Sequence, residues 1–415
     1  MTLYSKLLDR EKDQNPIKVG VIGAGQMGRG MIAQISTIPG MIVAGISDIN
    51  LDTANKAADE YRKTDTYGNE VHTSTDFKDI IHDENVEVVV EATGVTEVGA
   101  KVAMETLLAK KHLVLINVEI DITIGSLMKQ MYDAAGLIYT GSDGDEPAAV
   151  VELYEFAKTM GMEVLVAGKG KNNKLKVTAN PDTAKEEAES KNMNPHMLAA
   201  FQDGTKTMAE MNLLSNAIGF VPDIIGMHGV SADLDTTLEK LTTKENGGVL
   251  NNFGAVEYVD GLAPGVFVIV KGQNEGVSEE LNYLMKKGDR DHHILYRPYH
   301  LASLETPLTI AKAILEHDHA IVPMGVPVSD TVAVTKKAIK AGEPVDGIGG
   351  YCVRGVIAKH EEVLDKGFIP IGLVTGRTIA KRDIPEGTFL TEDDVELDTT
   401  TTVYRLRKMQ DEMIG

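Results

Sequence analysis

The chain has 415 residues, 43% hydrophobic and 25% charged, a composition typical of a globular protein with roughly two to three domains. Its formal net charge of −21 would repel phosphate groups, which disfavours nucleic acids and anionic membranes as partners. The single cysteine, Cys352, excludes an intramolecular disulfide and a cysteine-based zinc cluster.

The first residues and the apolar stretches bear on location. The chain begins without a basic region followed by a long apolar core, so we expect no signal peptide. No stretch reaches the ~20 consecutive apolar residues needed to cross a bilayer. These features together predict a cytoplasmic protein.

The most informative pattern lies near the start of the chain. An apolar run at 17–22 predicts a buried parallel strand, and a helix is expected at about 26–36. A G-x-G-x-x-G pattern joins them and is formed by Gly23, Gly25 and Gly28. The first glycine permits a tight turn, the second lets the backbone approach a pyrophosphate, and the third allows close helix–strand packing.

The residues that follow this turn support a dinucleotide site. Gln26 and Met27 open the helix, where unpaired N–H groups and the positive end of the dipole can bind phosphates. A second apolar strand at 41–46 leads to Asp48, 20 positions after Gly28, where a Rossmann unit places an acid on the ribose hydroxyls. The alternative is a glycine-rich turn without a cofactor, which the intact β-α-β unit disfavours.

Strand and helix patterns alternate up to about residue 168, as a parallel sheet requires. A valine-rich strand at 86–92 ends at Thr93 and Gly94, which should lie beside the cofactor because ligands bind at the carboxyl ends of such strands. We therefore expect an α/β fold with an N-terminal Rossmann domain over 1–150. Further strands are expected at 113–117, 137–141 and 163–167.

Three carboxylates crowd the loop after the strand at 137–141. Asp143, Asp145 and Glu146 fall where the nicotinamide half of the cofactor should lie. Such hard oxygen ligands suit Mg²⁺ or Mn²⁺, which would polarise a hydroxyketone. The alternative is that these acids only cap the helix that begins at Pro147.

Two lysines follow the strand at 163–167. Lys169 and Lys171 flank a glycine, and their ammonium groups could hold the phosphate or carboxylate of a substrate. The alternative is a solvated loop.

The candidate proton donor lies in an amphipathic helix expected at 201–214. Asp203 and Lys206 are three positions apart and would share one face of this helix. Lys206 could relay a proton during hydride transfer if burial lowers its pKa. A solvated salt bridge is the alternative, although Gly204 would weaken a merely structural helix.

The segment at 296–300, Tyr-Arg-Pro-Tyr-His, contains two further candidates. Arg297 could clamp an anion and His300 could act as an acid or base. The adjacent His292 and His293 cannot easily point at one ion on regular structure, which disfavours zinc. The alternative is a structural loop.

Two related phrases, at 337–345 and 380–390, each place an aliphatic residue before a glycine in a tight β setting. This part, 326–415, resembles the SAF domain, a small β-clip module with diverse roles. The residues between, 151–325, are assigned to an α+β domain for catalysis and subunit contact.

These parts together resemble the homoserine-dehydrogenase-like group that includes the 1-deoxy-D-xylulose 5-phosphate reductoisomerase-like enzymes. The resemblance rests on the Rossmann turn, the phrases at 201–206 and 296–300, and the SAF-like end. It implies an NADPH-dependent oxidoreductase acting on a small anionic hydroxyketone or aldehyde, with a reductoisomerase-like conversion of a sugar phosphate as the specific expectation. It also implies a homo-oligomer, such as a dimer.

One departure from the resembled group affects these expectations. Homoserine dehydrogenases carry Asn-Lys after the strand that here ends at Asn117, whereas this chain continues Val118-Glu119. Asn117 is kept as a cofactor contact, but the missing lysine puts simple homoserine oxidation in doubt. Asp48 would repel a 2′-phosphate and favours NADH, while the resemblance favours NADPH.

Three other functions remain open: a homoserine-type dehydrogenase that needs no metal, a non-redox lyase or isomerase, and a non-catalytic dinucleotide sensor whose output is the SAF-like part. The clustering of acid–base candidates in the second domain favours an enzyme.

Overall fold

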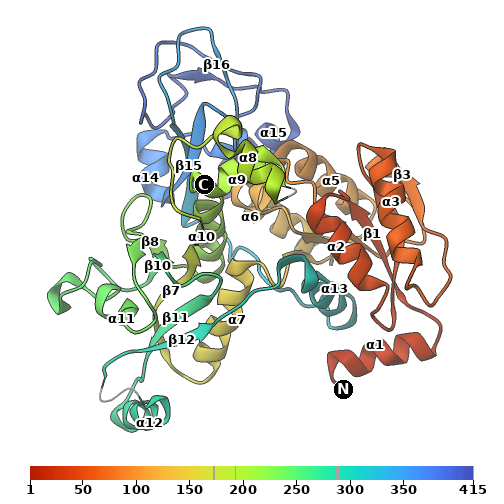
Figure 1. Cartoon of the computed structure of the whole chain (residues 1–415), viewed down its shortest axis with the longest axis horizontal. Helices are drawn as coiled ribbons and strands as arrows, with labels where there is room; N and C mark the ends of the chain where they lie inside the picture. Colours follow the sequence, from red (N-terminus) through yellow and green to blue (C-terminus); the bar gives the residue numbers. More distant parts are fainter. Residues whose placement is uncertain (172, 192, 287–289, 415) are drawn as a thin grey trace. The chain divides into compact units, whose positions relative to one another are not determined.

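The computed structural model describes residues 1–171, 173–191, 193–286 and 290–414 (Figure 1). The chain divides into two compact units, each built from separate stretches of sequence. Unit 1 comprises Met1–Asp145, Leu301–Gly325 and Thr400–Gly415. Unit 2 comprises Glu146–His300 and Val326–Thr399. Among the described residues, every helix is too short or too polar to traverse a lipid bilayer.

Unit 1 contains a six-stranded parallel sheet with the order β3-β2-β1-β4-β5-β6. Its strands are β1 (Ile17–Ile22), β2 (Met41–Ser47), β3 (His72–Ser74), β4 (Val88–Glu91), β5 (His112–Leu115) and β6 (Tyr139–Gly141). This is the strand order of the dinucleotide-binding doubly wound fold, with a switch point between β1 and β4. The predicted Rossmann fold is therefore confirmed.

Helices cover both faces of this sheet (Figure 1). The helices of unit 1 are α1 (Leu3–Lys12), α2 (Gln26–Ile35), α3 (Leu51–Arg62), α4 (Phe77–Ile81), α5 (Thr96–Leu108), α6 (Val118–Ala134), α13 (Thr306–Leu315) and α15 (Thr402–Ile414), with the short η2 (Ala302–Leu304). On one face, apolar side chains of α1, α2, α3 and α13 share a core with the strands, including the fully buried Met31, Tyr61 and Ile310.

The end of the chain also belongs to unit 1. Helix α15 packs against α5 and α6, and the Glu97 carboxylate of α5 accepts hydrogen bonds from the backbone N–H groups of Thr402 (3.1 Å) and Val403 (3.0 Å). A carboxylate in this position caps the start of α15 and complements its dipole. The boundary expected at 326–415 therefore differs from the compact units, because its last helix is held by the Rossmann domain.

Unit 2 is built on a mixed sheet of order β12-β11-β7-β10-β8, with β9 paired to β10. Its strands are β7 (Glu163–Lys171), β8 (Val221–Pro222), β9 (Val230–Ser231), β10 (Ala255–Asp260), β11 (Val266–Lys271) and β12 (His293–Arg297). Strand β7 contains the strand predicted at 163–167, but it does not continue the parallel sheet to which the alternation up to about residue 168 pointed. It pairs parallel to β10 and antiparallel to β11 instead.

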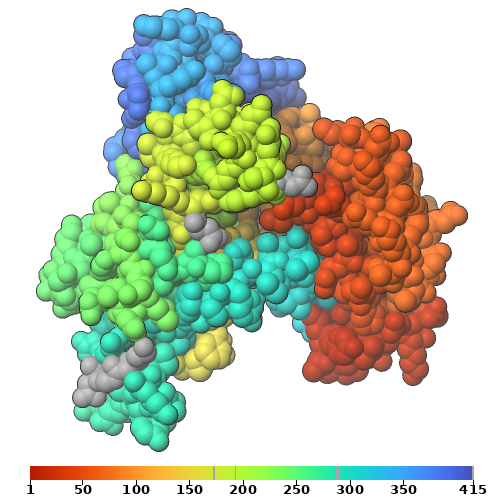
Figure 2. Space-filling model, viewed as in Figure 1, coloured from red at the N-terminus to blue at the C-terminus, as the bar shows by residue number. Residues whose placement is uncertain are grey.

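Helices α7 (Glu146–Thr159) and α10 (Thr205–Ile218) contribute to the core on one face of this sheet. The other face packs against residues from 230 to 262, which include α11 (Thr237–Lys240) and η1 (Lys244–Asn246). Helix α12 (Glu275–Met285) precedes β12. A helical pair, α8 (Pro181–Ser190) and α9 (Pro195–Gln202), packs around alanines and forms the yellow-green surface in Figure 2.

A small β module completes unit 2. It contains β13 (Ser329–Thr335), β14 (Pro344–Val345), β15 (Val353–Lys359), β16 (Thr378–Ala380) and β17 (Val395–Glu396), with α14 (His360–Lys366) and η3 (Ile371–Leu373). The two related sequence phrases meet here, because Ile339 and Ile384 exchange backbone hydrogen bonds of 2.9 and 2.8 Å. The tight β setting expected for both phrases is present, while the SAF designation stays a prediction.

Candidate active site

The glycine turn after β1 has no space for a side chain at two of its positions and is open at a third. Gly23 has a φ of 100°, and a Cβ there would lie 2.8 Å from the backbone carbonyl of Ala92. A Cβ on Gly28 would lie 2.0 Å from the Gly23 carbonyl oxygen. On Gly25, which caps α2, a Cβ would meet none of the described atoms within 4 Å. This open backbone at a helix N-terminus fits a pyrophosphate.

Asp48 lies where the sequence places it, beside the glycine turn. One carboxylate oxygen accepts a hydrogen bond from the Ala24 N–H (2.9 Å), and the other accepts one from the Asn50 N–H (2.9 Å). These bonds fix the carboxylate at the end of β2 and leave further lone pairs for ribose hydroxyls. The residues of this edge therefore fit an adenine dinucleotide.

A second group of residues at the carboxyl edge of this sheet follows β4 and β5. Glu91 is fully buried, and both the backbone N–H (2.9 Å) and the hydroxyl of Thr93 donate to its carboxyl group. Burial raises the pKa of Glu91 to about 7. Gly94 has a φ of 68°, and Asn117 caps α6 by accepting a hydrogen bond from Glu119 N–H (3.2 Å). The cofactor roles of Thr93, Gly94 and Asn117 stay predictions, and the sequence analysis did not single out Glu91, whose carboxyl group accepts from Thr93.

A buried charged cluster lies in unit 2, and we call it the Lys169 cluster. Lys169 of β7 is 5% exposed. Its ammonium donates to Glu146 at the start of α7 (2.7 Å) and to Glu210 of α10. The His300 Nε2 lies 3.4 Å from a Glu146 oxygen. The cluster is formed by Lys169, Glu146, Glu210 and His300.

Burial and mutual attraction give these groups different protonation behaviour. Burial acts to raise the pKa of Glu146, but the charges of Lys169 and His300 outweigh it and lower that pKa to about 2. Burial and the charge of Glu146 raise the pKa of Glu210. Burial opposes the charge on Lys169, but the two carboxylates raise its pKa. Glu146 is thus the fixed anion and Glu210 the carboxyl that more readily holds a proton.

The expected pairing of Asp203 with Lys206 is wrong. Gly204, with a φ of 89°, separates α9 from α10, so the two side chains do not lie on one helix face. Asp203 is fully buried and its carboxylate accepts a hydrogen bond from Lys336 at 2.9 Å. Lys206 lies one turn before Glu210 on α10, and its charge acts to lower the pKa of that carboxyl.

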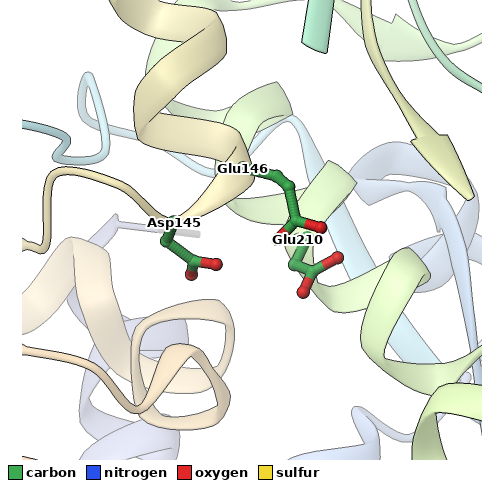
Figure 3. Close-up of side chains that lie close together, drawn as sticks. All are labelled: Asp145, Glu146 and Glu210. Atoms are coloured by element: carbon green, nitrogen blue, oxygen red, sulfur yellow. The ribbon is translucent and has the colours of Figure 1, made fainter. Parts of the chain in front are cut away.

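The predicted metal ligands divide between two environments. The Asp143 carboxylate is engaged by Lys312 (2.8 Å) and Thr309 (2.9 Å) of α13. The carboxylates that do approach one another, with an oxygen from each within 4.8 Å of the others, are those of Asp145, Glu146 and Glu210 (Figure 3). The ammonium of Lys169 already contacts two of these three acids. Glu210 was missed because, in a helix expected to be amphipathic, its acid is what a solvent-exposed position would carry.

The predicted substrate anion contacts are positioned differently from one another. Lys171 was expected in a loop past the strand, but β7 extends to this residue, and its buried ammonium donates to the Phe201 carbonyl (3.1 Å). Arg297 donates to Glu152 of α7 (2.8 Å), and its guanidinium lies 4.7 Å from the centre of the Tyr299 ring. Arg297 is therefore engaged on the side of α7.

Two family models match the chain. Residues 17–116 match the oxidoreductase family with an NAD-binding Rossmann fold, the GFO/IDH/MocA family. Residues 144–306 match the catalytic domain of oxidoreductase DRL, and this range contains the whole Lys169 cluster. Both matches are to oxidoreductases, and together they support an NAD(P)-dependent oxidoreductase as the class of this protein. The matched stretch at 17–116 is similar to the NAD-binding domain of the GFO/IDH/MocA family.

Individual proteins match this chain over a short stretch or with low sequence identity. An uncharacterized oxidoreductase, YrbE of Bacillus subtilis, is 31% identical over 97 residues, which cover 23% of this chain and 26% of that relative. A probable dehydrogenase from Thermotoga maritima is 18% identical with a TM-score of 0.43, covering 74% of this chain and 91% of that one. Myo-inositol dehydrogenase from Lactobacillus casei is 14% identical with a TM-score of 0.43, covering 75% and 88%.

Proposed function

We propose that the protein uses NADPH, with NADH as the alternative, to reduce the carbonyl of a small anionic hydroxyketone or hydroxyaldehyde. The observation that carries this proposal is the buried ammonium of Lys169 between two carboxylates, within the segment that matches an oxidoreductase catalytic domain. When bound, the coenzyme supplies a hydride. The residues of unit 2 then have to stabilise the oxygen of the carbonyl and protonate it.

Lys169 suits the first of these tasks. A carbonyl oxygen gains negative charge as its carbon is reduced, and a buried, pre-positioned ammonium stabilises that charge more than solvent would. Because its pKa is raised by two carboxylates, Lys169 keeps its proton. The ionised Glu146 holds the ammonium in place at 2.7 Å.

Glu210 and Lys206 suit the second task. Burial and the charge of Glu146 raise the pKa of Glu210, which favours a carboxyl group that can hold a proton and give it to the substrate oxygen. Lys206 lies one helical turn away on the half-exposed side of α10 and can resupply that proton. His300, beside Glu146, is the alternative acid.

The finer version of this proposal is a reductoisomerase-like conversion of a sugar phosphate. Asp145, Glu146 and Glu210 would then hold Mg²⁺ or Mn²⁺, whose Lewis acidity assists rearrangement of a hydroxyketone. A dehydrogenase without a metal is the second candidate. The metal-free dehydrogenase is favoured by the position of Lys169, because the Lys169 ammonium already neutralises two of the three acids.

The test is a turnover assay with the chelator-treated full chain. NADPH or NADH oxidation is followed against a panel of ketose phosphates and aspartate semialdehyde, with and without added Mg²⁺ or Mn²⁺. We expect reduction of a ketose phosphate, with kcat lowered about 10²-fold by Glu210→Gln and unchanged by Lys185→Gln, an exposed control. Metal-stimulated turnover supports the reductoisomerase version, and metal-independent turnover of aspartate semialdehyde alone supports the dehydrogenase. Coenzyme binding without any turnover would contradict the proposal and indicate a sensor.

A further inference from the structure

One of the buried lysines of unit 2 differs from the others in its partners. Of the three buried lysines in the described part of the chain, Lys169 contacts two carboxylates and Lys336 contacts Asp203 at 2.9 Å. Lys171 is 6% exposed, and its ammonium donates to one neutral acceptor, the Phe201 carbonyl at 3.1 Å. Among the described residues, no carboxylate lies within 4.0 Å of it.

Arg354 of β15 is a second cation that has no ion pair among the described residues. It is half-buried, and within the ranges that the structure describes its guanidinium forms neither a hydrogen bond nor an ion pair. Burial lowers its pKa, while the charge of Asp203 and the hydroxyl of Tyr258 act in the opposite direction. A guanidinium has five donors in a fork that matches an oxyanion, so its unused donors are the notable feature.

Both cations border the junction of α9 and α10. The ammonium of Lys171 contacts the Phe201 carbonyl in the last turn of α9. The backbone N–H of Gly355, the residue after Arg354, donates to the Thr205 hydroxyl at the start of α10 (2.8 Å). The carboxylate of Asp203, which lies between these two contact points in sequence, influences the pKa of both cations. Two strands from different parts of unit 2 thus bring positive charge to one short segment.

The surrounding charges do not balance Lys171 at ion-pair range. Burial lowers its pKa, and the positive charge of Lys169 lowers it further. The carboxylates of Glu210, Asp203 and Asp260 act in the opposite direction, but from more than 4.0 Å away. Burying a cation without a close counter-charge is unfavourable, and a bound anion would offset that cost.

We propose that Lys171 and Arg354 bind an oxyanion, a phosphate or carboxylate, carried by the substrate. This inference rests on the proposed function, which it deepens by dividing the two lysines of β7 between two tasks. Lys169 and Lys171 are two residues apart, so their side chains lie on the same face of the strand, roughly 7 Å apart along it. A short carbon chain would connect an oxyanion at Lys171 to a carbonyl at the Lys169 cluster.

The test measures binding of inorganic phosphate to the full chain by titration calorimetry, without coenzyme. We expect Lys171→Gln and Arg354→Gln each to weaken phosphate binding about tenfold or more, while the exposed control Lys185→Gln leaves it unchanged. Lys171→Arg and Arg354→Lys keep the charge and should retain most of the affinity. A parallel titration with acetate distinguishes a carboxylate site from a phosphate site.

Circular dichroism verifies that each variant is folded. If a glutamine variant does not fold, the charge-retaining variant at the same position is used for the binding comparison. Absence of phosphate and acetate binding to the unaltered chain would overturn the inference. The inference would also be overturned if both glutamine variants bound phosphate as tightly as the unaltered chain. In that case the phosphate could be bound at the glycine turn of unit 1, which neither substitution changes.

Failure of this inference is distinguishable from failure of the proposed function, because anion binding requires no turnover. If the turnover assay fails while the substitutions still weaken phosphate binding, the oxyanion site stands and the proposed reaction is wrong. If turnover is found, Lys171→Gln should raise KM for the substrate more than it lowers kcat, whereas Glu210→Gln should do the reverse.

Discussion

The glycine turn of unit 1 is formed by the backbone, whereas the Lys169 cluster of unit 2 is formed by side chains. The turn consists of residues close together in the sequence, and its features are backbone features: a positive φ at Gly23, a close approach at Gly28 and, among the described residues, a start of α2 that no N-cap side chain bonds. The cluster consists of side chains from α7, β7, α10 and the segment after β12, which are far apart in the sequence.

This difference teaches which sites a single sequence reveals. A backbone site leaves a local pattern, because each glycine is required by contacts within a few residues. A side-chain site leaves none, because its members meet only when a sheet and two helices pack together. The two regions also respond differently to change: the turn is sensitive to added volume, while the cluster is sensitive to lost charge.

The largest effect is expected from removing the central charge of the cluster. Lys169→Met should lower kcat/KM by about 10³-fold or more, because a buried donor no longer meets the developing negative charge. It should also lower the free energy of unfolding by about 3–5 kcal/mol, since two buried carboxylates lose their partner. Steady-state rates and urea unfolding measure both effects, with Lys185→Met as the control. Unaltered turnover in a folded Lys169→Met protein would contradict a role for the cluster, and coenzyme affinity should stay unchanged.

The second largest effect is expected from adding volume at the glycine turn. Gly28→Ala should weaken NADPH or NADH binding about 100-fold, or about 2.7 kcal/mol, because its Cβ would lie 2.0 Å from the Gly23 carbonyl oxygen. Gly30→Ala lies in the same helix, and its Cβ would make an ordinary contact, 3.6 Å from the Ser303 hydroxyl. Fluorescence titration with coenzyme compares the two variants. Equal affinities would show that the turn does not hold the coenzyme.

The smallest effect concerns the buried acid behind the turn. The pKa of Glu91 is raised from 4.5 to about 7 in the folded protein, so the folded state binds its proton more tightly than the unfolded state. Its contribution to stability is therefore complete below the unfolded pKa and is lost as pH rises through about 7. Between about pH 5.5 and 7.5, Glu91→Gln should flatten the decline in unfolding free energy by roughly 2 kcal/mol relative to the unaltered chain. Urea unfolding across this range measures the difference, and parallel curves for the two proteins would exclude the effect.

The Rossmann half could be predicted from the sequence in most respects. The strands at 17–22 and 41–46 were placed within a residue of the observed bounds, and Asp48 lies beside the turn through its hydrogen bond from Ala24. Apolar runs followed by glycines and an acid are local signals, and parallel pairing brings their carboxyl ends to one edge. The cofactor roles of these residues remain predictions.

The second half was predicted less well, for identifiable physical reasons. Gly204 adopts a left-handed conformation that splits the expected helix, so Asp203 faces Lys336 and not Lys206. Lys169 and Lys171 lie inside a longer strand because β10 and β11 pair with β7 on both sides. Glu210 resembled an ordinary helical acid until packing removed it from water.

The amino-acid sequence by itself determined the doubly wound sheet and the glycine turn, because hydrophobic period and backbone sterics act over a few neighbouring residues. Only the tertiary structure decided which charges are buried together and which remain without a counter-ion. That outcome depends on contacts between residues far apart in the chain, where the loss of hydration must be matched by a partner that local sequence does not specify.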